Sequence, residues 1–456
     1  MGSREKAGWQ AEAPAPQAYA MRLSIGVLIT VLLAAALAHV SPARRVIELP
    51  AGVIELRSEM LVAGGTEVRG ASAGTTLRLA AGFTGRAAVV VRGDGVRLSG
   101  FTIDGNRETL EIRAGLPRWD TPFARFTAAN GVFAEGVSGL VVENVRFRNI
   151  AGFAVLASRA RYVAIDRIQV AASGSRNATG RNNGTGGVLI EEGSTDFCVT
   201  RSEFRDIRGS GAWTHSLYTS PRNARGLIAQ NRFEFIGRDA VQVGHAIDVR
   251  VEDNAGRRIG FPLEDVDIEN RAIPVAIDTA GNVERSSYAR NRFEEINGKC
   301  IDLDGFHDGE VSGNACVNRG GAGATPFGHF GIVMNNANPD MRSRNIRVVG
   351  NTIDGPLFGG VFVIGEGHLV ARNRLLNLNA AHCDACYYRA DEPDMLRAGI
   401  YLGRGAERPA PARGNTIEEN EISGYHMKDR CIGLAPGIAP GANTIRNNAC
   451  VSTGRP

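Results

Sequence analysis

The stretch GKCIDLDGFHDGEVSGNACVN, residues 298 to 318, holds side chains that can do acid–base or metal chemistry. Asp302, Asp304, His307 and Asp308 lie between two cysteines. Residues i and i+2 of a strand project from one face, about 6.6 Å apart at the backbone. Carboxylates placed so can reach the roughly 6.5–9.5 Å separation of an inverting glycosidase, and two close acids raise one pKa, as a general acid requires. The same oxygens could instead bind Ca²⁺.

Acid, histidine, amide and aromatic side chains recur at comparable places in neighbouring segments. An aromatic ring on an outer face offers an apolar surface to a sugar ring, and histidines and acids can transfer protons. We expect Asp302, Asp304 and His307 to be joined as catalytic candidates by His215, Tyr218 and Asp239. The expected substrate-binding residues are Glu191, Trp213, Gln242, His245, His329 and Asn335.

These segments belong to a repeat that must position the side chains. A short strand ends in Asn-x-apolar, as in GLIAQNRF, SYARNRF and GEVSGNAC, and a second strand follows, as in AVQVGH, CIDLDG and GIVMNN. The second strands begin at residues 187, 211, 240, 272, 300, 331, 360, 399 and 431. Such a period without helical periodicity predicts a solenoid of stacked strands. Asn tolerates the left-handed conformation at the turns, and stacked Asn side chains can form a hydrogen-bond ladder.

Alternation along the second strands fixes which side chains face outward. The inward positions, such as Ile301 and Leu303, are apolar throughout except for Thr214. The outward positions should then form one continuous stripe, because neighbouring coils lie about 4.8 Å apart. That stripe includes Glu191, Trp213, His215, Gln242, Pro274, Ala276, Asp302, Asp304 and Asn335.

The opening IELPAGVIEL, the segment VRLSGFTIDGN at 96–106 and the Asn-punctuated coils resemble the right-handed parallel β-helix superfamily of pectate lyases and polygalacturonases. The resemblance covers about residues 46–452. It implies an all-β fold, a single-stranded right-handed parallel β-helix, and it is compatible with lyases, hydrolases, epimerases, tailspikes and adhesins.

The motifs of polygalacturonases can be compared position by position. Asp239 resembles the aspartate of the N-T-D strand, and His329 in GHFG resembles the G-H-G histidine. The sequence departs from the D-D pair, because Lys299 stands where the second aspartate would fall. For the lyase reaction, His215 or Tyr218 would abstract a proton while Gln242, an asparagine or an arginine neutralises the uronate.

The amino-acid composition limits the classes of binding partner. Of 456 residues 22% are charged, with a net charge of +4, which does not favour nucleic acid or an acidic polymer. The 57 glycines and 6% aromatics suit short strands and tight turns. We expect a monomer whose partner is a polysaccharide or oligosaccharide.

The cysteines predict three local disulfides. Six of the seven form close pairs in sequence, Cys300 with Cys316, Cys383 with Cys386 and Cys431 with Cys450, and Cys198 is left over. Because disulfides persist in oxidising compartments, they favour an exported protein. The alternative for HCDAC at 382–386 is a zinc site, but a second ligand pair is missing from the sequence.

Residues 22–38 form an apolar run that ends in Ala-Leu-Ala. This pattern is typical of a secretory signal peptide, and a retained membrane anchor is the alternative. We therefore divide the chain into a leader, residues 1–38, and a β-helix domain, residues 39–456. The expected location is periplasmic or secreted, with a membrane link only if the leader is uncleaved.

The sequence thus predicts an exported β-helix that cleaves glycosidic bonds in a groove on one outer face, with hydrolysis slightly favoured over elimination. The alternative is a non-catalytic carbohydrate-binding or adhesin-like β-helix. The motifs identify no cofactor, and Ca²⁺ is compatible with the paired acids. The insertions at 107–135, 171–186, 256–272, 317–330 and 379–398 should form the walls of the groove.

Overall fold

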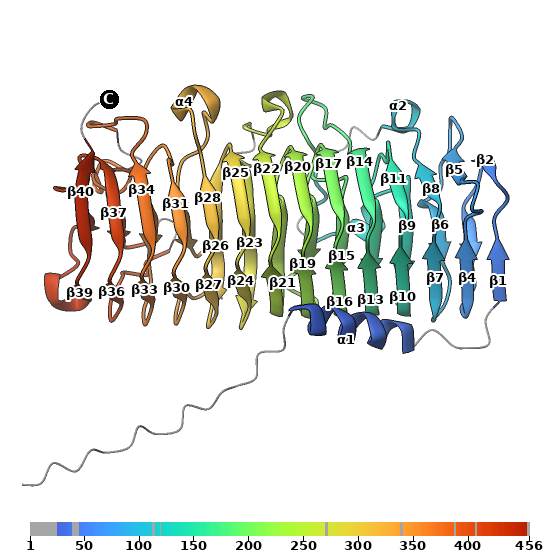
Figure 1. Ribbon diagram of the computed structural model, residues 1–456, viewed down its shortest axis with the longest axis horizontal. Coiled ribbons are helices and arrows are strands. Elements are labelled where there is room, and N and C mark those ends of the chain that lie inside the picture. Colours follow the sequence, from blue (N-terminus) through green and yellow to red (C-terminus); the bar gives the residue numbers. More distant parts are fainter. Residues whose placement is uncertain are drawn as a thin grey trace, which may run out of the picture.

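A computed structural model describes residues 25–38, 45–111, 115–118, 120–269, 272–337, 341–386, 389–405 and 408–453. From residue 45 onward the chain winds into a stack of coils, each with three strands that pair in parallel with the next coil (Figure 1). The predicted right-handed parallel β-helix is confirmed. The start of the leader and the boundary after Ala38 lie outside the described residues.

The strands form three faces, named here A, B and C. Face A contains β3 (Met60–Val62), β6 (Ala87–Val91), β9 (Asn130–Glu135), β12 (Val155–Ser158), β15 (Val188–Glu191), β18 (Ala212–His215), β29 (Ile332–Asn335), β32 (Val361–Val363), β35 (Ile400–Leu402) and β38 (Ile432–Leu434). Three long strands begin on face A and continue around a corner into face B: β21 (Val241–Glu252), β23 (Val275–Glu284) and β26 (Lys299–His307).

The remaining strands of face B belong to the same sheet as face A, because β21, β23 and β26 connect the two faces. They are β1 (Arg45–Glu48), β4 (Thr66–Arg69), β7 (Val96–Ser99), β10 (Ser138–Glu143), β13 (Arg161–Asp166), β16 (Thr195–Thr200), β19 (Asn223–Ala229), β24 (Ser287–Ala289), β27 (Glu310–Ser312), β30 (Arg347–Val349), β33 (Leu369–Ala371), β36 (Thr416–Glu418) and β39 (Thr444–Arg446).

Face C is a separate sheet. Its strands are β2 (Gly52–Leu56), β5 (Thr75–Leu79), β8 (Thr102–Asp104), β11 (Arg146–Arg148), β14 (Gln169–Ser173), β17 (Glu203–Ile207), β20 (Arg232–Ile236), β22 (Ala255–Ile259), β25 (Arg292–Ile296), β28 (Ala315–Val317), β31 (Thr352–Asp354), β34 (Arg374–Leu378), β37 (Glu421–Tyr425) and β40 (Ala449–Thr453).

The helices lie outside the coils. They are α1 (Ile25–Ala38), α2 (Arg107–Leu110), α3 (Phe123–Phe126), α4 (Gly321–Ala324) and the 3₁₀ turns η1 (Leu263–Asp265) and η2 (Pro440–Ala442). Within the described residues, the helices are all too short or too polar to cross a membrane.

The inward side chains of the three faces fill one continuous core. The predicted alternation is confirmed on face A for most coils, since residues such as Ile301, Leu303, Ile332 and Met334 belong to this core. One coil was predicted in the wrong register. Val241 pairs with Ile277, so the coil after β21 carries its outward side chains at Asp278 and Ala280 rather than at Pro274 and Ala276. The direction of alternation was right, but the insertion is four residues longer than predicted.

An asparagine ladder runs along the turn between faces B and C, as predicted. The side-chain oxygen of Asn314 accepts from the backbone N–H and the amide of Asn291 at 3.0 and 2.9 Å, and its amide donates to Tyr288 O and to Asn351 Oδ1, both at 2.9 Å. The expected left-handed conformation is adopted by Asn144 and Asn447 of the repeat, at φ of 52° and 55°, but not by the asparagines of the ladder. Positive φ falls on the preceding residue, for example Arg290 at 56°, which leaves the asparagine free to reach along the stack.

Helix α1 lies against face B, next to β10, β13 and β16 (Figure 1). Its Ala36 is buried with a row of outward face B side chains: Val141, Ala164, Cys198, Leu227 and Ala229. The three predicted disulfides are present, and Cys198 is free and buried. The segment that resembles a signal peptide therefore covers an apolar strip of the β-helix in this structure.

Candidate active site

Four strands of face A, namely β18, β21, β23 and β26, carry the candidate site. Their outward side chains follow one another in register, from Trp213 to Gln242, Asp278 and Asp302. Asp278 was missed because of the register error. A signal was present in the sequence, since AIDTAG at 276–281 and CIDLDG at 300–305 share the pattern Ile-Asp-x-x-Gly.

Asp239, Asp278 and Asp302 form an acidic cluster. Asp239 is 2% exposed and its Oδ1 accepts from the backbone N–H of Val275 at 2.9 Å. Burial raises the pKa of Asp239 to about 6, and the charge of Asp302 adds to the effect. Burial, followed by the charges of Asp239 and Asp302, raises the pKa of the partly exposed Asp278 well above its usual value. The cluster therefore keeps at least one carboxyl protonated well above pH 4.

Two cations neutralise part of this charge. Lys299 forms an ion pair with Asp302 Oδ2, and the charges of Asp302, Asp278 and Asp304 raise the pKa of Lys299 against the opposing effect of burial. Arg238 lies 3.3 Å from Asp239 and over the ring of Trp213. The lysine that departs from the D-D pair thus serves as the counter-charge of the cluster. Its ammonium would repel Ca²⁺, so the structure does not favour calcium at Asp302.

Asp304 projects outward beside Asp302, as predicted, but its Oδ1 accepts from the backbone N–H of Ala337 at 2.8 Å. It therefore holds the segment that follows β29. Asn335 pairs with Asp304 in register and caps the same segment through Asn336 N. His329 is half-buried against Phe358, and burial together with the charge of Lys299 lowers its pKa.

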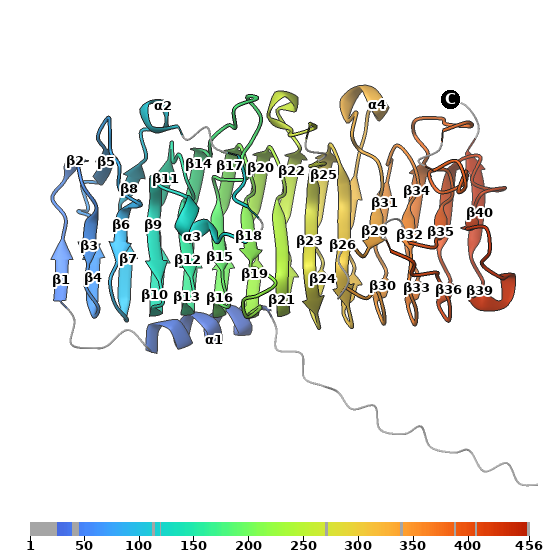
Figure 2. The same cartoon turned by 180° about the vertical axis from the view of Figure 1, so that it is seen from behind.

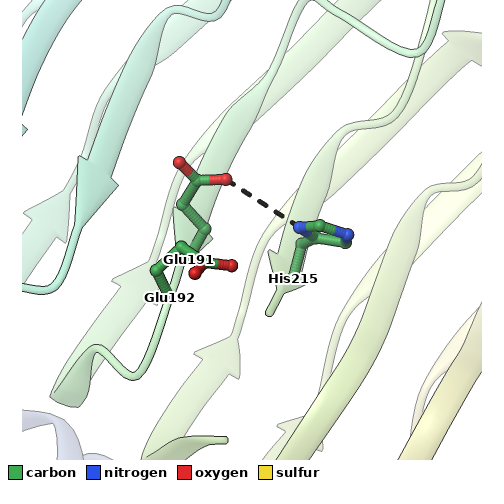
Figure 3. Close-up of side chains that lie close together, drawn as sticks. All are labelled: Glu191, Glu192 and His215. Atoms are coloured by element: carbon green, nitrogen blue, oxygen red, sulfur yellow. Dashed lines mark ion pairs between the residues drawn. The ribbon is translucent and has the colours of Figure 1, made fainter. Parts of the chain in front are cut away.

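At the other end of the site, Glu191 and His215 point toward one another from β15 and β18, with Glu192 beside them (Figure 3). His215 Nδ1 lies 3.8 Å from Glu191 Oε2. Among the described residues, these three form the one group with the geometry to hold a metal ion. Both oxygens of Glu191 already accept backbone N–H groups, from Phe123 at 3.0 Å and Ala124 at 2.7 Å. That bonding fits a structural anchor better than a metal ligand.

Two predicted substrate contacts are corrected by burial. Glu191 is fully buried and cannot touch a substrate, because α3 lies over it. Trp213 is 5% exposed and packs edge-to-face with Phe123, with the two ring centroids 4.8 Å apart, so it is no open platform. The insertion at 107–135 was expected to form a wall of the groove, but its helix α3 packs directly on Glu191 and Trp213.

Tyr218 is the exposed aromatic side chain of this region, 45% accessible, and its ring lies 4.9 Å from that of His245. Burial, and then the charge of Arg222, lowers the pKa of His245 to about 4, so its imidazole is neutral at pH 7. His307 is placed elsewhere. It lies at the corner toward face B, where its ring nitrogens contact Asp308 at 2.7 Å and Asn282 at 2.8 Å, outside the acidic cluster.

The site is rich in polar atoms that lack a partner. Five buried side-chain atoms on these strands have no hydrogen-bond partner among the described residues: Trp213 Nε1, His215 Nδ1, Gln242 Oε1, His245 Nδ1 and Asp302 Oδ1. Unsatisfied buried groups each cost about 1–3 kcal/mol. Their concentration on one face is the pattern expected of a site whose ligand supplies the missing bonds.

Comparison with solved structures supports the architecture. The Dettilon tailspike protein matches with 13% identity and a TM-score of 0.52, over 76% of this chain and 63% of its own. The GH136 lacto-N-biosidase from Eubacterium ramulus matches with 11% identity and a TM-score of 0.51, over 86% of this chain and 63% of its own. These likenesses establish the fold.

The β-helix spans less than two thirds of the length of either neighbour. No protein-family model matches the sequence, and a search of curated proteins finds no match either. The function of this β-helix must therefore be argued from its own site.

Proposed function

We propose that the protein hydrolyses glycosidic bonds of an oligosaccharide or polysaccharide at the acidic cluster of face A. The observation that carries the proposal is the contrast between two aspartates on adjacent coils. Asp278 has a strongly raised pKa, whereas Asp302 is paired with Lys299. One protonated and one ionised carboxyl group are what glycoside hydrolysis requires.

In this mechanism Asp278 donates its proton to the glycosidic oxygen as the bond from that oxygen to the anomeric carbon breaks. The two acids lie one strand spacing apart, about 4.8 Å, which is close to the roughly 5–5.5 Å of retaining glycosidases. Asp302 therefore attacks the anomeric carbon through Oδ1, the oxygen that Lys299 does not hold, and forms a glycosyl ester as the leaving group departs. Water then attacks the anomeric carbon, gives a proton to the ionised Asp278 and frees Asp302, so one water is added across the bond. Gln242 would supply a hydrogen bond to a sugar hydroxyl, because it neighbours Asp278 on the same face and its Oε1 lacks a partner among the described residues.

Asp304 was expected to be the second carboxylate. We assign that role to Asp278 instead, because Asp304 is engaged by the backbone of Ala337. The three disulfides support export, since such bonds persist in oxidising compartments.

The test is to assay Asp278→Asn and Asp302→Asn on a panel of glycans by the release of reducing ends. Each variant should lose about 10²–10⁴-fold in rate while keeping glycan binding. Asp253→Asn is the matched control, since Asp253 pairs with Arg290 away from face A. Unsaturated uronate products would show a lyase, and binding without turnover by the parent protein would show a carbohydrate-binding protein.

A further inference from the structure

Face A is covered on the N-terminal side of the acidic cluster. The outward side chains of β6, β9, β12 and β15 are buried, although they lie on the outside of the coil: Val90, Phe133, Leu156 and Leu189. They pack with Phe123 and Ala124 of α3 in a second apolar cluster that ends at Trp213. Figure 2 shows α3 over this part of face A. We call this cover the N-terminal wall.

The N-terminal wall is fastened to the coil by a buried acid. Glu191 lies in β15, and its two oxygens bind the first two backbone N–H groups of α3. Phe123 also packs edge-on against Phe153 and Trp213, at 5.6 and 4.8 Å between ring centroids. A glycan that extends along the stack cannot pass Trp213 without displacing these contacts.

The other side of the cluster is closed as well. The outward side chains of β29, β32 and β35, namely Val333, Phe362 and Tyr401, are at most 9% exposed. The Tyr401 hydroxyl donates to Glu392 Oε2 at 3.1 Å, and Arg404 Nε donates to Glu392 Oε1 at 3.1 Å. The insertion that contains Glu392 therefore lies over these strands. We call it the C-terminal wall.

Between the walls, small residues hollow the floor. Gly244 and Ala280 stand in register between His215 and Asp304, so at this outward position two successive coils offer no side chain larger than a methyl group. The partly exposed outward side chains between the walls are His215, Asp278, Ala280 and Asp304, with Asn335 of β29 at the edge. They run from β18 to β26, four strands that span about 14 Å at the usual strand spacing. That length suits a few sugar rings and is too short for the interior of a long chain lying along the stack.

We propose that the protein binds short oligosaccharides or the ends of glycan chains, and that Phe123 and the Tyr401–Glu392 contact set this length limit. The inference rests on the proposed carbohydrate function but not on hydrolysis. The insertions thus determine substrate length, while the coils supply the acids.

The test uses an array of homo-oligosaccharides of glucose, galactose and galacturonate in graded lengths, with the parent polymers, for both binding and product analysis. The binding affinity should rise with oligosaccharide length and reach a plateau after a few sugar residues. The products should be released from one end of the glycan only. Phe123→Ala should move the plateau to longer oligosaccharides. Phe126→Ala is the matched control, since Phe126 belongs to the same helix but is exposed, and it should leave the plateau unchanged.

Tyr401→Phe is an independent test at the C-terminal wall, because it removes the hydrogen bond to Glu392 and keeps the ring. It should also move the plateau to longer oligosaccharides. Thermal unfolding verifies that each variant is folded. A length plateau without cleavage would support the length limit and overturn hydrolysis. Internal cleavage of polymers into fragments of many sizes would overturn the limit and leave hydrolysis standing. Binding to none of the probes would overturn both.

Discussion

Asp278 and Asp302 occupy equivalent outward positions on adjacent coils, because Ile277 pairs with Ile301 in the core beneath them. Two carboxyl groups at one strand spacing cannot both ionise cheaply. Lys299 compensates part of this repulsion, because its ammonium group pairs with Asp302, three residues later on the same strand. Each of the following predictions tests one part of this arrangement or of the scaffold that holds it.

Asp239 should make stability depend on pH between about 4 and 6. Burial raises its pKa from 3.8 to about 6, so in this window the folded state binds more protons than the unfolded state. The free energy of unfolding therefore falls as pH rises through the window, by up to about 3 kcal/mol. Urea unfolding at pH 4 and pH 7 measures the change. Asp239→Asn should flatten this part of the profile, and an unchanged profile would contradict the assignment.

Lys299→Met should destabilise the protein because it leaves the charge of Asp302 without its partner. Breaking a buried pair costs about 3–5 kcal/mol, and the loss should shrink toward pH 4 as the acids take up protons. Lys428→Met is the matched control, since Lys428 is an exposed lysine far along the chain. Equal unfolding midpoints in denaturant for the two variants at pH 7 would argue against a counter-charge at Lys299.

Asn314→Ala should cost at least about 3 kcal/mol of stability, because it removes one link of the ladder and leaves both Asn291 and Tyr288 with unsatisfied buried groups. Asn448→Ala removes the final link, where the side chain is only part-buried and water can replace it. We expect about 1 kcal/mol there. Chemical denaturation of both variants gives the comparison, and similar losses would mean that the ladder position does not matter.

Cys198 should resist alkylation while α1 covers it. Burial raises the pKa of its thiol to about 12, which keeps the reactive thiolate scarce at neutral pH. A chain that lacks residues 1–38 should react faster with iodoacetamide, as followed by mass spectrometry. Equal rates for the two chains would show that α1 does not protect face B in solution.

Much of the scaffold could be predicted from the sequence. Alternation around Ile301 and Leu303 and the asparagine ladder follow from local patterns that recur in many coils, and the disulfide pairs follow from cysteines that are close in the sequence. The register of β23 could not be predicted, because the preceding insertion has no repeat of its own and four extra residues leave the alternation unchanged. Because of that error, Asp278 was not among the predicted outward residues of the site.

The site was predicted only in part. Asp239, Gln242 and Asp302 lie together, and the outward positions of Gln242 and Asp302 were predicted by the alternation. The burial of Glu191 and Trp213 was missed, because it depends on a contact between α3 and a coil more than sixty residues later in the chain. The contact of His307 with Asn282 likewise depends on the neighbouring coil, because Asn282 lies in β23, which pairs with β26. Such contacts leave no local pattern in the sequence.

The bond between Cys300 and Cys316 fastens β26 to β28 across the core, and β26 is the strand that bears Lys299 and Asp302. Protein produced under reducing conditions would lack this disulfide, and the strand that carries Lys299 and Asp302 would be less firmly fixed. Activity measured on protein from a reducing cytosol should therefore rise after oxidative refolding, so the oxidation state of a preparation should be established before its kinetics are interpreted.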